Sequence, residues 1–213
     1  MSLYPADPNT GILFRRTDIP GQNATIPARF DHVSDTRLCT TLSNEAGVQI
    51  ATVEHLMAAL AGCEIDNVII EVNGMEVPIM DGSAEPFVFL IECAGTVHQN
   101  AARRVLRVKK PVFILEGGAE ASLTPGSADQ PALTIDLNID FNNAAIGQQN
   151  LSLTISSSSF KSEICRARTF GFMEDVEALR QSGLAKGGSL ENAVVISGGN
   201  ILNEDGLRYK DEF

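Results

Sequence analysis

Histidine is scarce in this chain: only His32, His55 and His98 occur among its 213 residues. A catalytic zinc site usually takes three protein ligands, and a helix that supplied two of them would show H-x-x-x-H or H-E-x-x-H spacing. Neither pattern occurs. The four cysteines also lack C-x-x-C spacing, which argues against a disulfide framework and a thiolate zinc knuckle. Local spacing therefore reveals no complete metal site.

Basic residues are also few. The chain has 16 lysines and arginines against 27 acidic residues, which gives a formal net charge of −11. Binding to nucleic acid or to an anionic membrane needs a basic face, so this composition argues against both. The basic cluster at 103–110 is interpreted as a solvated strand face or a linker. Small anionic ligands remain compatible with the charge.

Long apolar runs are absent as well. No run approaches the roughly 20 residues that cross a bilayer, and the first residues lack the charged-then-apolar pattern of a signal peptide. We therefore expect a cytoplasmic protein without a membrane span. The apolar content of 44% is that of a globular protein, and the length allows one or two domains.

Against these absences, one pair of residues points to chemistry. Val53, Leu56, Met57 and Leu60 follow helical i, i+3, i+4, i+7 spacing, which predicts a helix over 53–61 with Thr52 as its N-cap. Glu54 and His55 then fall in the first turn, off the apolar stripe. Free backbone N–H groups there favour a carboxylate and a neutral imidazole, the form that binds metals.

The pair also has ordinary interpretations. A glutamate in the first turn of a helix complements the helix dipole, and a single histidine beside it is more often a surface or core residue than a ligand. Taken alone, Glu54 and His55 favour the structural interpretation. Cys39 is the cysteine of most interest, whereas the others read as small reduced apolar residues.

The remaining pattern predicts alternating strands and helices. Expected strands cover 12–15, 67–72, 77–80, 105–115, 133–141, 152–155, 169–172 and 192–196, and expected helices cover 85–94, 158–165 and 173–181. A polar stretch near residue 100 predicts a domain boundary. We therefore expect an α+β fold with two domains, 1–100 and 101–213, each a two-layer sandwich of a sheet on helices.

Several stretches taken together resemble one family, the zinc-dependent UDP-3-O-acyl-N-acetylglucosamine deacetylases of lipid A biosynthesis. The resemblance rests on Asp35 to Thr40, Thr52 to Leu56, Val77 to Phe87, Ile139 to Asn142, Arg166 to Met173 and Leu202 to Arg208. These stretches occur in order along essentially the whole chain.

The resemblance implies roles for particular residues. His55 would be a zinc ligand, Glu54 the general base that takes a proton from water, and Thr169 a donor to the tetrahedral oxyanion. Leu38, Cys39 and Phe141 would contact the substrate, a UDP-linked acylated amino sugar, with Phe141 stacking on the uracil. The reaction would remove the N-acetyl group and release acetate.

The same resemblance implies a βαβ insert at about 169–196 that forms an apolar passage for the acyl chain. Its expected lining residues are Phe170, Met173, Val176, Leu190, Ala193 and Val195. Such residues suit burial of an acyl chain because each buried methylene contributes about 0.8 kcal/mol. A plain core stripe is the ordinary alternative for this composition.

The match also has departures. In the family, a histidine and an aspartate four residues apart supply the remaining zinc ligands, and these would lie beyond Phe213, as would a later histidine. The family's opening strand segment is missing as well. We therefore expect a chain truncated at both ends, with weak or absent Zn²⁺, little deacetylase activity, and self-association through the apolar surface left uncovered.

Two alternatives stay open. The chain could be a non-catalytic fragment that binds the nucleotide sugar and the acyl chain without chemistry. A small-molecule kinase ranks last, because Gly187, Gly188 and Ser189 after Lys186 lack the spacing of a phosphate-binding loop and fit a turn better.

Overall fold

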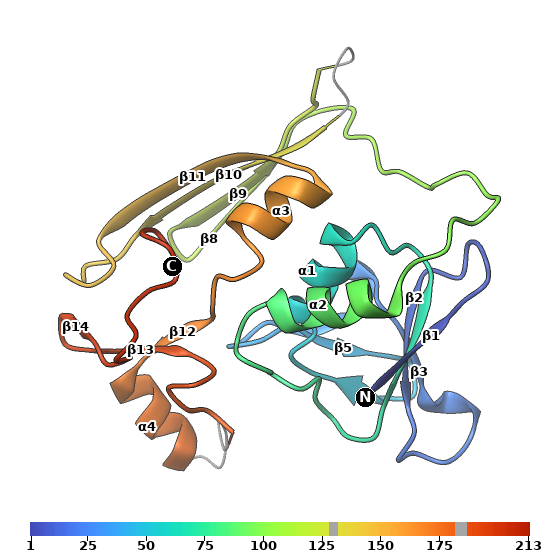
Figure 1. The fold of residues 1–213 in the computed structure, drawn as a ribbon, viewed down its shortest axis with the longest axis horizontal. Helices are drawn as coiled ribbons and strands as arrows, with labels where there is room; N and C mark the ends of the chain where they lie inside the picture. The colour runs from blue at the N-terminus through green and yellow to red at the C-terminus, as the bar shows by residue number, and fades with distance from the viewer. Residues whose placement is uncertain (128–131, 182–186) are drawn as a thin grey trace.

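The computed structural model describes residues 1–127, 132–181 and 187–213. It combines helices with several small sheets, as the predicted α+β class requires (Figure 1). The N-terminal half gathers two sheets around helices α1 and α2, and the later elements form two β-hairpins and a βαβ unit. Within the described ranges, no helix combines the length and apolar character needed to span a bilayer.

The main N-terminal sheet has four strands in the order β1-β7-β2-β3. Its strands are β1 (Ser2–Pro5), β2 (Ile12–Arg16), β3 (Thr25–Pro27) and β7 (Val68–Val72). Strand β7 runs parallel to β2 and antiparallel to β1. Its alternate residues Val68, Ile70 and Val72 are buried, because successive side chains on a strand point to opposite faces.

A second sheet and two helices complete this half. The sheet consists of β4 (Val33–Asp35), β5 (Thr41–Ser43) and β6 (Gln49–Ile50), the 3-10 turns are η1 (Gln22–Ala24) and η2 (Phe30–His32), and the helices are α1 (Glu54–Gly62) and α2 (Glu85–Ala94). The predicted stripe of α1 is confirmed, since Val53, Leu56 and Leu60 are buried. Phe14, Ile26 and Ile50 join them in one continuous core.

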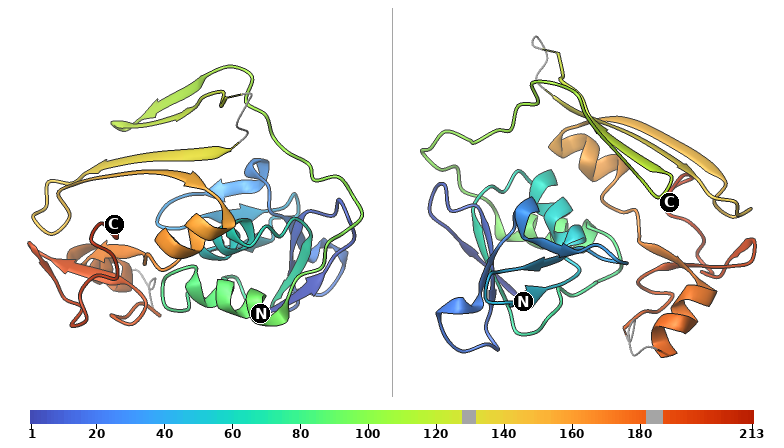
Figure 2. Two further views of the ribbon diagram at one scale, coloured as in Figure 1. Left: turned by 45° about the horizontal axis from the view of Figure 1, so that its top comes forward. Right: turned by 180° about the vertical axis from the view of Figure 1, so that it is seen from behind.

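Two hairpins follow residues 95–111, which form no helix or strand. The first pairs β8 (Val112–Glu116) with β9 (Ala119–Leu123), and the second pairs β10 (Leu133–Asp140) with β11 (Gln148–Ile155). Each hairpin is a separate two-stranded sheet, and they lie one above the other in the left view of Figure 2. Helix α3 (Ser157–Glu163) follows, and its Phe160 reaches the N-terminal core.

The predicted βαβ unit is present. Strands β12 (Phe170–Phe172) and β13 (Val194–Ser197) are parallel and are connected through α4 (Met173–Gln181), and β14 (Asn200–Ile201) pairs antiparallel with β13. Residues 182–186 of the insert, including Lys186, lie outside the described residues. The C-terminus lies between this unit and the hairpins (Figures 1 and 2).

Some local predictions are wrong. Val77 to Met80 forms no strand: Pro78 has no N–H to donate, Met80 has a φ of 55°, and the only ladder contact nearby is a bridge between Ala51 and Glu76. Thr52 is not the N-cap of α1, because its hydroxyl donates to Glu76 at 2.6 Å and Val53 takes the cap position. The two-domain division stays a prediction.

Candidate active site

Glu54 is held at the start of α1 by the loop that precedes β5. The backbone N–H of Thr40 donates to Glu54 Oε2 at 3.0 Å, and the Thr40 carbonyl accepts from the N–H of Val53 at 3.4 Å. The loop and the helix start are therefore joined by two hydrogen bonds. This fixes one oxygen of the carboxylate, and in the hydrogen bonds of the described residues Glu54 Oε1 takes no part.

His55 is half-buried beside Glu54. Burial lowers the pKa of His55, and the nearby carboxylates of Glu54 and Asp81 raise it by less, so the net pKa lies below the ordinary value. The imidazole is therefore neutral over a wider pH range, which is the form that can bind a metal ion.

Glu54 and His55 both line an open pocket of about 240 Å³. Its other lining residues are Ala58, Ala84, Phe160, Ile164, Cys165 and Ala167. The pocket thus lies between α1, the start of α2 and the segment that leads from α3 into β12. A carboxylate and an imidazole that line a pocket with mostly apolar walls are a setting in which proton transfer is useful.

Thr169 is joined by its backbone to the loop at 79–83, and it is not among the residues that line this pocket. Its backbone N–H donates to the Gly82 carbonyl at 2.8 Å, and its own carbonyl accepts from the N–H of Val194 at 2.9 Å. Gly82 has a φ of 81°, and a Cβ built there would lie 2.1 Å from the Asn192 carbonyl oxygen. Only glycine allows this close approach. Asp81, the neighbour of Gly82, is the second carboxylate, after Glu54, that raises the pKa of His55.

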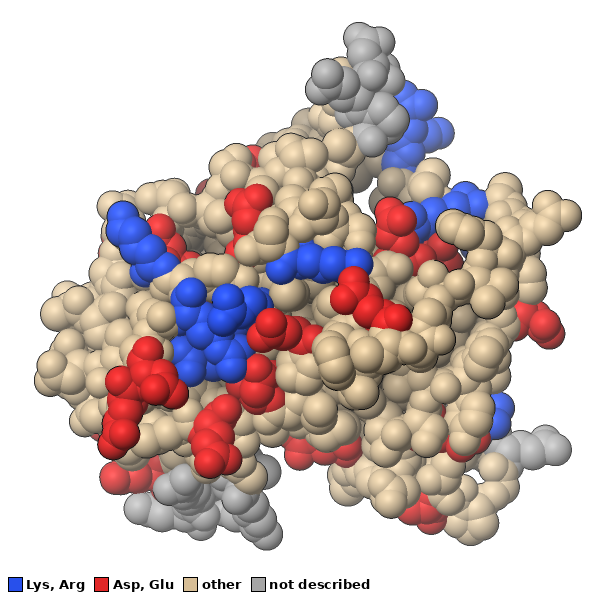
Figure 3. Space-filling view, in the orientation of Figure 1, with Lys and Arg blue, Asp and Glu red and all other residues tan. Residues whose placement is uncertain are grey.

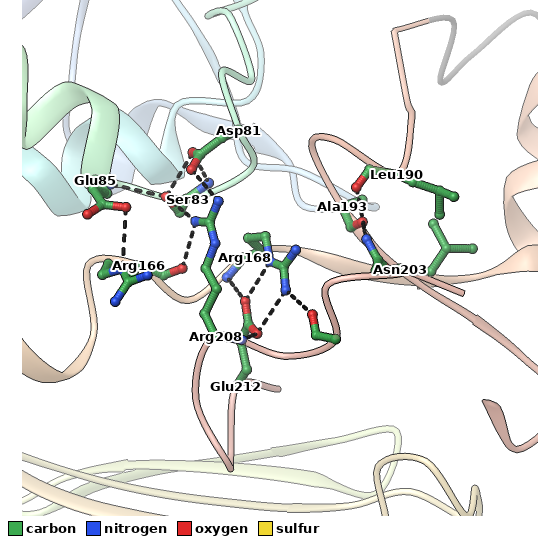
Figure 4. A network of polar contacts seen from close by, with 12 residues as sticks. Asp81, Ser83, Glu85, Arg166, Arg168, Leu190, Ala193, Asn203, Arg208 and Glu212 are labelled. Atoms are coloured by element: carbon green, nitrogen blue, oxygen red, sulfur yellow. Dashed lines mark hydrogen bonds and ion pairs between the residues drawn. The ribbon is translucent and has the colours of Figure 1, made fainter. Parts of the chain in front are cut away.

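A polar network surrounds this contact (Figure 4). Arg208 pairs with Asp81 at 2.8 Å, donates to Ser83 Oγ at 3.3 Å, and donates to the Arg166 carbonyl at 3.0 Å. Burial raises the pKa of Asp81, but hydrogen bonds from Ser83 and Arg208 outweigh it and leave the pKa below its ordinary value. The Asp81 carboxylate is therefore charged where it faces His55.

The second ion pair of the network is buried. Arg168 Nε lies 2.7 Å from Glu212 Oε1, and the two side chains are only 7% and 0% exposed. The backbone N–H of Arg168 donates to the same carboxylate at 3.1 Å, and Arg168 Nη2 donates to the Gly206 carbonyl at 2.8 Å. Arg168 is thus fixed at both its side chain and its backbone.

The predicted acyl-passage residues lie mostly within the βαβ unit. Asn203, which is buried, donates to the carbonyls of Leu190 and Ala193 at 2.8 Å each and accepts from the N–H of Val195 at 2.9 Å. One amide side chain therefore organises three of the six predicted residues. The side chain of Val195 is buried, whereas that of Leu190 is 46% exposed. Met173 and Val176, on α4, are half-buried.

An aromatic cluster joins Phe141 to the same unit. Phe141 makes an edge contact with Phe170 at a centroid distance of 5.7 Å, and Phe172 lies 6.1 Å from Phe141. Phe213, which the sequence pattern did not single out, lies 5.1 Å from Phe170 with its ring edge-on. The structure thus brings two predicted substrate residues, Phe141 and Phe170, into contact.

Leu38 and Cys39 lie on the loop that holds Glu54. Leu38 is 76% exposed and has a φ of 68°, a conformation uncommon for a bulky residue. Arg37 donates to Asp35 from its side chain and its backbone, which stabilises the turn. Cys39 is half-buried, with its sulfur 3.8 Å from Thr41 Oγ1. Both residues lie just before Thr40 in the sequence, and the Thr40 N–H donates to Glu54 Oε2.

The donor set of this region does not make a complete zinc site. Across residues 1–127, 132–181 and 187–213, no three side chains of histidine, cysteine, aspartate or glutamate come together to hold a metal ion. His55 offers one imidazole, whereas a catalytic zinc usually takes three protein ligands. The residues present therefore fit only part of such a site.

On the face shown in Figure 3, basic side chains stand among acidic ones.

Comparison with known proteins decides the family. The family described as UDP-3-O-acyl N-acetylglycosamine deacetylase matches residues 1–213. This chain belongs to that deacetylase family. A relative from Idiomarina loihiensis is 52% identical over 100% of this chain and 69% of its own length. Relatives from Histophilus somni and Pasteurella multocida are each 51% identical, over 100% of this chain and 68% of their length. All three are named UDP-3-O-acyl-N-acetylglucosamine deacetylase.

The contacts of several residues around this candidate site were not predicted from the sequence. They are Thr40, which donates to Glu54, Asp81, whose charge acts on His55, and Asn203, Arg208 and Glu212, which hydrogen-bond to Val195, Ser83 and Arg168 respectively. Apart from Glu212, all of these residues lie in the stretches on which the family resemblance rests, but nothing local marked their contacts. The Thr40 contact uses a backbone N–H, so no residue type could have signalled it.

Proposed function

We propose that this protein is a zinc-dependent amide hydrolase that removes the N-acetyl group of UDP-3-O-(3-hydroxyacyl)-N-acetylglucosamine in lipid A biosynthesis. The observation that carries the proposal is the pairing of Glu54 and His55 in one pocket, in a chain that matches the deacetylase family over its whole length. The relatives bear the name of that activity. The cellular location that fits this proposal is the cytoplasm.

Each site residue has a distinct task in the proposal. Glu54 is the general base: Thr40 holds Oε2, which leaves Oε1 to accept a proton from the attacking water. His55 is a zinc ligand through its neutral imidazole. Zinc, when bound, supplies Lewis-acid activation of the amide and of water. The hydroxyl of Thr169 donates to the oxyanion that develops on the acetyl carbonyl. Cleavage of the C–N bond then gives acetate and a free amine.

Substrate contacts are assigned to the βαβ unit and its neighbours. Phe170, Met173, Val176, Leu190, Ala193 and Val195 would line a passage for the acyl chain. Asn203 supports this assignment, because its hydrogen bonds fix the backbone of the segment from Leu190 to Val195. Phe141 is assigned to the uracil, and Leu38 and Cys39 to the sugar end of the substrate, next to the loop that holds Glu54.

A second candidate has one observation in its favour. The described residues gather only part of a zinc site, as a non-catalytic fragment that binds the nucleotide sugar and the acyl chain would. The two candidates differ in metal content and in turnover. Both can be measured on this chain and on the product of the whole reading frame.

The test is acetate release from the UDP-linked substrate together with zinc content after dialysis. We expect the product of the whole reading frame to hold one equivalent of zinc and to release acetate. In that protein Glu54→Gln should lower kcat by about 10²- to 10⁴-fold, because the base is lost. Glu71→Gln, a matched change on β7 outside the pocket, should leave kcat unchanged.

Near-normal turnover of Glu54→Gln would reject the base assignment. Binding of the substrate without acetate release by any form of the protein would favour the non-catalytic candidate. One equivalent of tightly held zinc in the 213-residue chain would contradict our expectation that it binds zinc weakly.

A further inference from the structure

The chain segment 206–213 contacts the residues on both sides of Thr169. Glu212 pairs with Arg168, the residue before it, and Phe213 packs edge-on against Phe170, the residue after it. The two contacts differ in kind. One is a buried ion pair with 0% exposure of the Glu212 side chain, and the other is an aromatic contact at 5.1 Å.

The same segment also holds the partner of Thr169. The Thr169 N–H donates to the carbonyl of Gly82. Arg208 contacts the residues on both sides of Gly82, because it forms an ion pair with Asp81 and donates to Ser83 Oγ. Arg208 is in turn tied to Glu212, because its backbone N–H donates to Glu212 Oε2. The segment 206–213 therefore contacts the neighbours of both Thr169 and Gly82, and Figure 4 shows its Arg208 and Glu212 beside Asp81, Ser83 and Arg168.

We propose that Glu212 and Phe213 are positioning residues that aim the Thr169 hydroxyl at the reacting acetyl group. This inference rests on the deacetylase proposal and extends it from the residue that contacts the oxyanion to the segment that orients it. Thr169 precedes the three-residue strand β12, and its own backbone groups pair with Gly82 and Val194, so its setting depends on the positions of those partners and of its chain neighbours.

Two kinds of contact make this segment a suitable support. Arg168 donates to Glu212 from its backbone N–H and from its guanidinium, so the main chain entering Thr169 is held as well as the side chain. Phe213 packs edge-on against Phe170, whose ring also contacts Phe141 and Phe172. A displacement of about 1 Å in a catalytic group can cost about 10²-fold in rate.

The kinetic test uses the product of the whole reading frame and a double-mutant cycle. We expect Glu212→Gln and Phe213→Leu each to lower kcat by about 10- to 100-fold with KM little changed, because positioning acts in the transition state. In a Thr169→Ala background, neither change should lower kcat further, since the hydroxyl that they orient is gone. Glu71→Gln should leave kcat unchanged in both backgrounds.

Equal fold losses in the two backgrounds would overturn the inference, as would a change confined to KM. Phe213→Leu keeps the inference falsifiable if Glu212→Gln folds poorly, because a leucine retains the apolar contact but loses the ring geometry. Normal turnover of Thr169→Ala would overturn the positioning role and leave the deacetylase proposal standing.

A second readout is independent of activity. In the 213-residue chain, we expect Glu212→Gln and Phe213→Leu to speed hydrogen exchange at the Thr169 and Val194 amides by at least about tenfold, while the amides of β7 keep their protection. Unchanged exchange at Thr169 in both variants would overturn the inference. If no form of the protein releases acetate, the deacetylase proposal fails, and the exchange result alone decides whether 206–213 holds Thr169.

Discussion

Strands β7 and β10 both carry apolar residues at alternate positions, but the surroundings of these residues are very different. In β7, Val68, Ile70 and Val72 are at most 5% exposed, whereas in β10, Leu133, Ile135 and Leu137 are 41–59% exposed. Strand β7 belongs to a four-stranded sheet that packs in the main core, whereas β10 pairs only with β11. An apolar pattern therefore predicts a strand, but burial requires a second layer that covers it.

The same contrast applies to whole regions. The continuous core draws its buried residues from 14–91, with Phe160 and Cys165 added from the segment after the hairpins. The hairpin β8–β9 is exposed along both strands. The free energy of unfolding should therefore respond strongly to changes in the first region and weakly to changes in the hairpins.

The largest expected effect comes from removing a core ring. Phe14 is 0% exposed, so Phe14→Ala should lower the free energy of unfolding by about 3–5 kcal/mol. Phe113 on β8 is 65% exposed, and Phe113→Ala should change the free energy of unfolding by less than about 0.5 kcal/mol. Urea unfolding curves for the two variants test the contrast. Equal losses would show that the hairpin face is covered in solution.

The next effect concerns the buried ion pair. Glu212→Gln breaks its pair with Arg168 and should cost about 3 kcal/mol, since a buried charge is left without its partner. Asp136 on β10 only accepts from Ser152 on an exposed surface, so Asp136→Asn should cost less than about 0.5 kcal/mol. Thermal unfolding of both variants at neutral pH measures the difference.

The pH dependence of stability gives the same pair a second test. Burial raises the pKa of Glu212, but hydrogen bonds from Arg168 and from two backbone N–H groups outweigh it, so the folded pKa is lowered. A lowered carboxyl pKa stabilises the fold above the unfolded pKa, and this contribution is lost as the pH falls through the folded value. The wild type should therefore lose more stability on acidification than Glu212→Gln. Parallel curves of unfolding free energy against pH for the wild type and Glu212→Gln would contradict this expectation.

The smallest contrast compares two glycines with positive φ. Gly82→Ala would place a Cβ against the Asn192 carbonyl, whereas Gly118, in the turn between β8 and β9, faces open space. Gly118→Ala should cost about 1 kcal/mol for the strained backbone alone. Gly82→Ala should cost about 1–3 kcal/mol more, because it also overpacks a close contact. Urea unfolding of both variants at the same pH would measure the two losses in unfolding free energy. Equal losses for Gly82→Ala and Gly118→Ala would mean that the loop at 79–83 can move to make room for the added Cβ.

How much of the fold could be predicted follows from the range of the interactions. Helix α1 depends on local spacing, and its buried stripe was predicted correctly. The strand predicted at Val77 to Met80 was wrong, because its apolar residues satisfy a strand pattern while Pro78 and the positive φ of Met80 prevent pairing. Strands β4, β5 and β6 are two or three residues long and were missed, since such lengths carry no periodic signal.

For the candidate site, the residue pattern pointed to Glu54 and His55, whereas Thr169 and the chemistry of all three came from the resemblance to the deacetylases, and their mutual placement stays part of the proposal. The residues that hold them were beyond sequence reasoning. Arg208 lies 125 residues along the chain from Ser83, to which it donates, and Glu212 lies 44 residues from Arg168. No local pattern marks a partner at that separation.

By itself the sequence determined the helix that presents Glu54 and His55, the alternating strands and the family to which the chain belongs. Each of these depends on residue type and short-range spacing. The tertiary structure alone decided that β7 is buried while β10 is exposed, and that 206–213 reaches both sides of Thr169. Burial and ion pairing depend on which surfaces meet after the chain has folded, and short-range spacing does not contain that information.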